Sequence, residues 1–181
     1  MRPLAAALAR QEFAAAETPA MDEETFRLFY NRTARPLRAY IGATLHDYSL
    51  ADDIMQESFL RLLQAGLPAA IEEEHRKNYL FRIATNLMRD HFRSVKNVPL
   101  GDSASGETLG EEIAQRQDMR RIMEELNPKQ RELLWLAYVE RFSHGEIAGM
   151  VGAKTESIRP MLARARHSLA ELLRRRTGVS T

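Results

Sequence analysis

Apolar side chains recur at spacings of three and four residues along most of the 181-residue chain. This spacing is the period of an amphipathic helix, and no stretch alternates in the manner of a half-buried strand. Glycine, proline, asparagine and serine separate the periodic stretches, as they do at helix ends and turns. The pattern therefore predicts an all-α protein.

Three helices are predicted in the first half of the chain. The first begins after Asp22, is interrupted at Pro36 and then resumes. The second has Ser49 as its N-cap and ends at Gly66, and the third runs from about residue 75 to 96. The apolar stripe of the second helix is expected to face the core and consists of Ile54, Met55, Phe59, Leu62 and Leu63.

The second half is predicted to end in a helix-turn-helix. Asn127 and Pro128 provide an N-cap and a first helical residue, and Gln130 completes a capping-box pattern. A second capping box at residues 143–146 opens a short helix that stops at Gly152, and a basic amphipathic helix follows. The apolar core of this pair is predicted to contain Ile147, Ala148, Val151, Ile158 and Leu162, with the small residues Ala148 and Gly149 at the helix crossing.

Residues 97–117 differ in composition from the stretches on either side. They contain clustered glycine and serine and few large apolar side chains, which is typical of a flexible linker. The sequence therefore predicts two small helical domains, residues 22–96 and 118–176, joined by this linker and flanked by tails at 1–21 and 177–181.

Charge and composition narrow the range of functions. The net charge is only +1, but residues 118–181 hold 12 basic and 8 acidic side chains, which favours a DNA-facing C-terminal domain over a merely solvated basic helix end. The chain has no cysteine, and its five histidines are scattered without metal-ligand spacing. No nucleophile–base pair or phosphate-binding glycine loop is found. We therefore expect no catalytic residue, metal, cofactor or membrane insertion.

Two helices of the first domain carry candidate surfaces. Opposite the apolar stripe of the second helix lie Asp52, Asp53, Gln56 and Glu57, and such an acidic face taken alone is most often only solvated. The third helix mixes aromatic residues with arginine and carries Asn86. Aromatic rings beside arginine can stack on unpaired bases, although core packing also explains Phe81 and Phe92.

Three segments in order resemble one family. DDIMQESFLRL resembles region 2.2, YLFRIATNLMRDHFR resembles regions 2.3 and 2.4, and LNPKQRELLWLAYVERFSHGEIAGMVG resembles region 4 of bacterial sigma factors of the extracytoplasmic-function type in the sigma-70 family. The resemblance covers roughly residues 22–96 and 118–176. It implies a promoter-specificity subunit that binds core RNA polymerase, directs it to promoters and promotes melting at the minus-ten element.

The resemblance also implies roles for individual residues. The positions that match polymerase-binding residues are Asp53, Gln56 and Glu57. The positions that match the surface reading the minus-ten element are Arg76, Lys77, Tyr79, Arg82, Asn86, Arg89 and Arg93. The positions implied for the minus-thirty-five element are Lys154, Thr155, Glu156, Ser157, Arg159, Arg164 and Arg166.

The recognition helix departs from the family pattern. Lys154 stands where the family often has serine, and Met161 where it often has arginine. Pro160 lies inside the predicted helix, where it removes a backbone donor, so we expect a kink or a late helix start.

The resemblance implies core RNA polymerase, promoter DNA and an anti-sigma factor as partners, in the bacterial cytoplasm. Two other readings remain open. A sigma-like mimic would bind an anti-sigma factor without engaging DNA, but it would not need the acidic face, Asn86 and the arginines. A helix-turn-helix repressor would leave the first domain unexplained.

Overall fold

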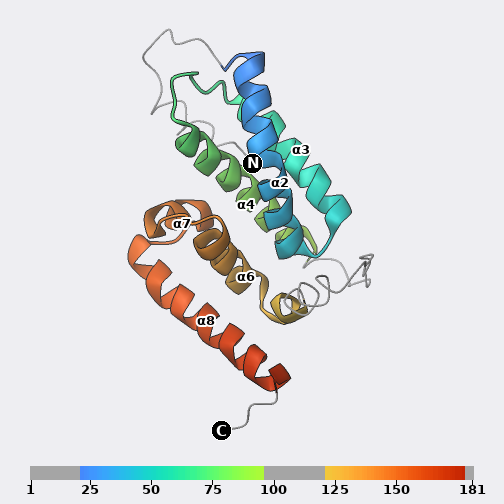
Figure 1. Ribbon diagram of the computed structural model, residues 1–181, viewed down its shortest axis with the longest axis vertical. Helices are drawn as coiled ribbons and strands as arrows, with labels where there is room; N and C mark the ends of the chain where they lie inside the picture. Colours follow the sequence, from blue (N-terminus) through green and yellow to red (C-terminus); the bar gives the residue numbers. More distant parts are fainter. Residues whose placement is uncertain (1–20, 96–120, 178–181) are drawn as a thin grey trace.

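The computed structural model describes residues 21–95 and 121–177, and both ranges are helical, which confirms the all-α prediction (Figure 1). The first range contains α2 (Glu23–Leu45), α3 (Tyr48–Gln64) and α4 (Glu73–Val95). The second range contains α6 (Pro128–Leu134), the π-helix η1 (Trp135–Val139), α7 (His144–Val151) and α8 (Thr155–Thr177), preceded by helical residues 121–125. Across these two ranges there is no β-strand.

Helices α2, α3 and α4 lie side by side and bury a common apolar core (Figure 1). Helix α2 starts at Asp22 as predicted, and Asp22 is its N-cap, since its carboxylate accepts a hydrogen bond from the backbone N–H of Thr25. The predicted interruption at Pro36 is wrong, because α2 continues through this residue. The residues that follow it, Leu37, Tyr40 and Ile41, are fully buried, and their packing outweighs a cost of about 3 kcal/mol for an interior proline.

The ends of α3 differ in detail from the prediction. Its N-cap is Asp47, which accepts from the N–H of Leu50 at 2.9 Å, and Ser49 lies within the first turn. Gly66 follows the last turn with a φ of 60°, as a left-handed helix stop requires. Of the predicted apolar stripe, only Leu63 does not face the core, since 46% of it is exposed.

The local signals at the start of α6 are only partly confirmed. Asn127 caps the helix through the N–H of Gln130. The Gln130 side chain, however, donates to Ser168 of α8 at 2.9 Å, so the reciprocal bond expected of a capping box is absent from the described contacts. The stretch expected to be one helix changes after Leu134 into η1, where the N–H of Glu140 bonds to the carbonyl of Trp135.

Helices α7 and α8 form the predicted helix-turn-helix. The Ser143–Glu146 capping box is complete, and Gly152 ends α7 in the left-handed region with a φ of 64°. The five residues predicted for its small core are all buried. Of the two outcomes expected at Pro160, the late start of the recognition helix is wrong, because α8 begins at Thr155 and contains Pro160, while the kink stays a prediction. Gly149 is exposed with open space around it, so it does not serve a close crossing.

Helices of the N-terminal half pack directly against helices of the C-terminal half, and we call this contact the seam. Helix α4 lies along α7, and α2 lies along α6. Phe142, which is 6% exposed, meets Phe81 of α4 edge-to-face with ring centroids 5.2 Å apart. Buried residues from both halves therefore form one continuous core.

Arg131 of α6 is the main polar link across the seam. It is 4% exposed, and its guanidinium donates to the carbonyls of Thr44 (2.9 Å) and Ala43 (3.3 Å) at the end of α2 and contacts His46. It also donates to the carbonyl of Leu126 at 2.8 Å. The last carbonyls of α2 have no partner within the helix, so Arg131 satisfies them. Burial lowers the pKa of Arg131 to about 10, with Glu124 opposing this shift, so it stays charged at neutral pH.

A second polar cluster lies beside Arg131. The Tyr40 hydroxyl contacts the Thr85 hydroxyl at 2.8 Å and donates to the carboxylate of Glu132 at 3.3 Å. Burial raises the pKa of Glu132, although Arg89 and the hydrogen bond from Tyr40 oppose the shift. Three helices, α2, α4 and α6, are thus joined by one buried network.

Within the described ranges, no helix is both long and apolar enough to cross a lipid bilayer.

Substitution Arg131→Met is expected to lower the free energy of unfolding by about 3 kcal/mol, because two buried carbonyls and one partly buried carbonyl lose their donor. Urea denaturation followed by circular dichroism measures the loss. The matched control is Arg35→Met on the exposed side of α2, which should change the free energy by less than about 0.5 kcal/mol. Equal effects of the two variants would contradict the role of Arg131.

Substitution Glu132→Gln is expected to stabilise the fold at pH 7 and to have little effect below pH 4.5. The folded-state pKa of Glu132 is raised, so the folded protein binds more protons than the unfolded chain, and stability falls as pH rises from the unfolded pKa through the folded one. Glutamine keeps the acceptor for Tyr40 and removes this pH-dependent loss. Urea midpoints of both proteins between pH 4 and 8 test the difference, and parallel pH profiles would contradict it.

Candidate nucleic-acid interface

One face of α4 carries most of the residues predicted to read DNA. Arg82 and Arg93 are exposed, and Tyr79, Asn86 and Arg89 are half-buried on the same helix. Arg93 forms a loose ion pair with Asp90 on its own helix, at 3.6 Å. Arg89 donates weakly to Asn86 at 3.4 Å, so these two predicted residues are brought together.

Arg76 does not lie on this face. It is 3% exposed, and its guanidinium donates to the carbonyls of Ile71 (3.0 Å) and Ala69 (3.2 Å) and stacks on Phe29. Arg76 therefore holds the loop between α3 and α4 against the core. The prediction of a DNA contact at Arg76 is corrected on this ground, because a buried guanidinium that is already hydrogen-bonded cannot reach a phosphate.

The side chain of Lys77, the next residue, points toward the turn before α7. Its ammonium lies 2.9 Å from the carboxylate of Glu140 and over the rings of Phe81 and Phe142, at 5.5 and 5.0 Å. Lys77 is thus engaged with the C-terminal helices in this conformation.

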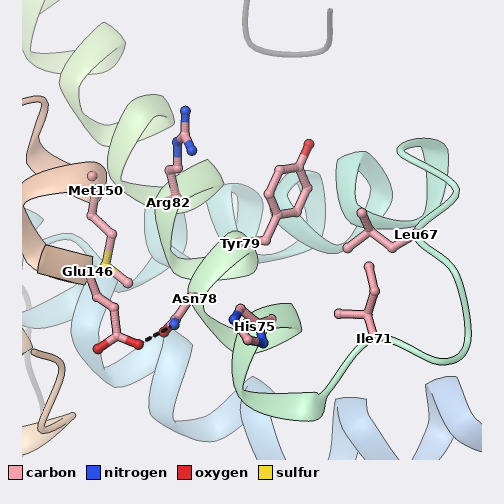
Figure 2. A pocket seen from close by; sticks show the side chains of 9 residues that line it. Leu67, Ile71, His75, Asn78, Tyr79, Arg82, Glu146 and Met150 are labelled. Atoms are coloured by element: carbon pink, nitrogen blue, oxygen red, sulfur yellow. Dashed lines mark hydrogen bonds between the residues drawn. The ribbon is translucent and has the colours of Figure 1, made fainter. Parts of the chain in front are cut away.

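A pocket of 220 Å³ opens between the loop before α4, the first turns of α4, and α7 (Figure 2). Leu67 and Ile71 of the loop form an apolar wall opposite Met150 of α7. Tyr79 and Arg82 line it from α4, with the polar side chains of His75, Asn78 and Glu146 along one side. Apolar walls with a few convergent polar groups are typical of sites for flat, partly polar ligands such as a nucleobase.

Asn78 is a functional candidate that sequence reasoning missed. Its amide donates to the Glu146 carboxylate at 2.5 Å, while its own amide oxygen is buried without a partner among the described residues (Figure 2). Burial alone would raise the pKa of Glu146, but hydrogen bonds from Ser143 and Asn78 lower it below the usual value. The only sequence signal for Asn78 was its position four residues before Arg82, on the same helical face.

The acidic face of α3 lies on another side of the molecule, on the helix that flanks α2 and α4 (Figure 1). Asp53 and Gln56 are exposed, and Glu57 accepts a hydrogen bond from Arg61 at 2.7 Å. Leu60 and Leu63 continue this face with exposed fractions of 49% and 46%. This apolar extension was not predicted from the sequence. Leu60 lies four residues after Gln56 and Leu63 three residues after Leu60, a spacing that places both leucines on the same side of the helix as Gln56.

Asp52, next to this face, is held by a salt bridge from α2. Both oxygens of its carboxylate accept from the guanidinium of Arg38, the second at 3.0 Å. This hydrogen bond lowers the pKa of Asp52. The bidentate pair fixes the first turn of α3 against α2 and leaves Asp53 on the open side.

The predicted minus-thirty-five residues lie at the start and on the outer side of α8. Six of them are exposed: Lys154, Thr155, Glu156, Arg159, Arg164 and Arg166. Ser157 is half-buried. Arg166 donates to the hydroxyl of Tyr138 in η1 at 3.0 Å, which fixes its direction relative to the helix-turn-helix.

Residues 21–95 and 121–177 contain no group of three or more His, Cys, Asp or Glu side chains that could hold a metal ion. The arrangement offers three separate surfaces: an acidic and apolar face on α3, a cationic and aromatic face with a pocket on α4, and an exposed basic helix α8.

Comparison with known sequences identifies both halves. Sigma-70 region 2 matches residues 29–98, and sigma-70 region 4 matches residues 116–169. The RNA polymerase sigma factor NccH of Alcaligenes xylosoxydans xylosoxydans is 31% identical over 165 residues, which cover 84% of this chain and 88% of that protein. The RNA polymerase sigma factor SigZ of Bacillus subtilis (strain 168) is 28% identical over 148 residues, covering 77% and 81%.

Two solved structures share the fold. The sigma factor RpoE in complex with the anti-sigma factor NepR from Bartonella quintana superposes with a TM-score of 0.67 at 24% identity, covering 82% of this chain and 96% of that one. CnrH in complex with the cytosolic domain of CnrY gives a TM-score of 0.62 at 22% identity, covering 93% and 94%. With region 2 and region 4 both matched in order, and with a relative above 30% identity along most of its length, the chain belongs to the sigma-70 family of RNA polymerase sigma factors, in its extracytoplasmic-function branch.

Proposed function

We propose that this protein binds core RNA polymerase, directs it to a specific set of promoters and promotes melting of the minus-ten element. The observation that carries the proposal is the presence of three separate surfaces in family order on one chain, each with the chemistry of one of these tasks. The protein itself contributes binding energy and no catalytic residue, while the polymerase supplies the chemistry of RNA synthesis.

The face of α3 is proposed to dock on the polymerase. Asp53, Gln56 and Glu57 supply the polar contacts, and the exposed leucines Leu60 and Leu63 extend them with apolar area. A mixed surface of this kind suits a protein partner, because apolar burial contributes affinity while the charges fix the register.

The face of α4 is proposed to capture unpaired bases of the minus-ten element. Tyr79 can stack on a base, Asn86 can hydrogen-bond to a base edge, and Arg82 and Arg89 can contact phosphate or base. Lys77 points away from this face toward Glu140, so it can contact DNA only after leaving that carboxylate. Arg93 extends the cationic stripe, whereas Arg76 is left out because it is buried. Base flipping costs a few kcal/mol, and stacking with hydrogen bonds in a shaped pocket offsets it, so recognition is coupled to melting.

Helix α8 is proposed to read the minus-thirty-five element in duplex DNA. Its exposed N-terminal turns carry Thr155, Glu156 and Arg159, with Lys154 directly before them. Arg164 and Arg166 lie one to two turns later, and Ser157 sits at the edge of the face. A recognition helix reads base edges through its first turns, so these residues are the proposed readers.

An anti-sigma factor is proposed as a regulatory partner, in the bacterial cytoplasm. Support comes from the two solved complexes, in which proteins of the same fold are bound to the anti-sigma factor NepR and to the cytosolic domain of CnrY. Affinity purification of the chain from its native host, followed by mass spectrometry, tests this partner. Recovery of polymerase subunits without any second stoichiometric protein would count against it.

The purified protein is expected to bind core RNA polymerase and to initiate transcription selectively from a randomised promoter library. Core polymerase alone is the control and should initiate without selection. Enrichment of one minus-ten sequence supports the proposal, and enrichment at minus thirty-five would show that α8 reads DNA despite Pro160. A chain that fails to bind core polymerase would refute the proposal.

Two sets of substitutions should separate polymerase docking from DNA melting. Asp53→Ala with Glu57→Ala is expected to weaken core binding at least tenfold, because both carboxylates lie on the docking face. Asn86→Ala is expected to leave core binding unchanged and to reduce promoter opening at least tenfold. Fluorescence anisotropy measures the first quantity and permanganate footprinting the second. Equal loss of both activities in both proteins would contradict the assignment.

A further inference from the structure

Two apolar side chains interrupt the polar outer face of α8. Pro160 and Ala163 are exposed, and Pro160 lies four residues after Glu156, so all three share one side of the helix. The inner side of the same turns is formed by the buried residues Ile158 and Leu162. Pro160 and Ala163 therefore belong to the face proposed to read duplex DNA, and neither is part of the apolar core.

Pro160 weakens the helix that carries it. It lies inside α8, where it lacks the N–H that would otherwise bond the carbonyl of Glu156. The buried neighbours Ile158 and Leu162 keep α8 continuous, but the proline ring itself is exposed and gains no packing in return. Residues that disfavour their own secondary structure without such a gain are expected at functional sites. The position of Pro160 therefore favours a role in binding over a role in stability.

The charged side chains beside Pro160 suit base edges. Within residues 21–95 and 121–177, the side chains of Glu156 and Arg159 have no hydrogen-bond or ion-pair partner, so both are available to DNA. Phosphate repels the carboxylate of Glu156, whereas the major groove offers it the amino group of cytosine. Arg159 can donate to guanine in the same groove. The free carboxylate therefore places this turn, and Pro160 with it, against the bases and not against the phosphate backbone.

We propose that Pro160, with Ala163 beside it, reads the methyl group of a thymine in the minus-thirty-five element. The proposal rests on the function given above and names one base that α8 selects. In the major groove thymine is the base that presents a methyl group, and apolar side chains recognise it by direct contact. A proline ring has no donor or acceptor, so against the polar edge of another base it would leave a desolvated group unpaired.

The size of one methyl group sets the expected selectivity. Burying one such group changes a binding constant about fourfold. Proline and alanine lose no rotamer freedom when they are buried, in contrast to lysine and arginine, so the contact keeps this gain. Pro160 and Ala163 thus add selection at one base pair, while the polar residues around them select at others.

Holoenzyme reconstituted from the full chain and core polymerase tests the proposal on promoters selected from the randomised library. Each thymine of the minus-thirty-five element, on either strand, is replaced in turn by deoxyuridine, which removes the methyl group and keeps every hydrogen-bonding atom. Wild-type holoenzyme is expected to bind one of these promoters about fourfold more weakly, as measured by fluorescence anisotropy. The same replacement upstream of the element is the DNA control and should leave binding unchanged.

Substitution Pro160→Gln removes the proposed reader. Glutamine restores the backbone N–H and favours the helix, so circular dichroism should show at least the wild-type helix content. The variant holoenzyme is expected to bind the thymine and deoxyuridine promoters equally, and this ratio does not depend on its overall affinity. The matched control is Ala170→Gln, which places the same side chain at an exposed position later in α8 and should keep the fourfold preference.

Three results would overturn the methyl reader. The first is equal binding of thymine and deoxyuridine promoters by the wild-type holoenzyme at every minus-thirty-five position. The second is a preference for thymine that persists in Pro160→Gln, because another group would then contact the methyl. The third is a selected minus-thirty-five element that contains no thymine on either strand.

The same holoenzymes separate this proposal from the function on which it rests. Initiation by the wild-type protein at the selected promoters reports the function and does not require the methyl contact. If the wild-type protein initiates there without a preference for thymine over deoxyuridine, the methyl reader is wrong and the function stands. If the wild-type protein does not bind core polymerase, the sigma function is wrong and the methyl reader falls with it.

Discussion

Burial of Arg131 against the C-terminal end of α2 is the interaction on which the arrangement of the two regions depends. An isolated guanidinium is costly to bury, and here the last carbonyls of α2 compensate it. The carbonyls at the end of α2 have no partner in their own helix, so they require donors from elsewhere, and the guanidinium supplies them. Once Arg131 is seated, α6 lies on α2 and Glu132 is drawn next to Tyr40. The position of α7 over α4 follows, because η1 and a short turn connect α6 to α7.

Helix α4 has to serve two purposes with one set of side chains. Its inner face packs Leu80, Phe81 and Met88 into the core, and its other face carries the donors proposed for DNA. Two adjacent residues near the start of the helix have different partners. Arg76 holds the preceding loop, and Lys77 points to the seam. Region 4 supplies acceptors for Lys77, Asn78 and Arg89. Arg82 and Arg93 stay exposed to solvent.

Local signals in the sequence predicted much of the fold. Asp22, Asn127 and the Ser143–Glu146 pair cap the helices that follow them, and glycines end α3 and α7 in the left-handed region. Errors arose where packing overrode a local preference. Pro36 disfavours a helix, yet the buried residues after it keep α2 continuous. Gln130 fits a capping box, but Ser168 on another helix takes its side chain. The turn into η1 had no recognisable signal in the sequence.

Residues close together along the chain were enough to predict the helical class, most helix ends, the family and the three stretches that carry the candidate surfaces. The contacts that these stretches make within one molecule emerged only from the folded chain. It placed Arg76 inside and Lys77 in the seam, revealed Asn78 as the partner of Glu146, and left Leu63 exposed on α3. The physical reason is that burial and pairing depend on residues far apart in sequence. Lys77 and Glu140, or Arg131 and Thr44, meet only when helices from the two halves pack, and no local pattern encodes that contact.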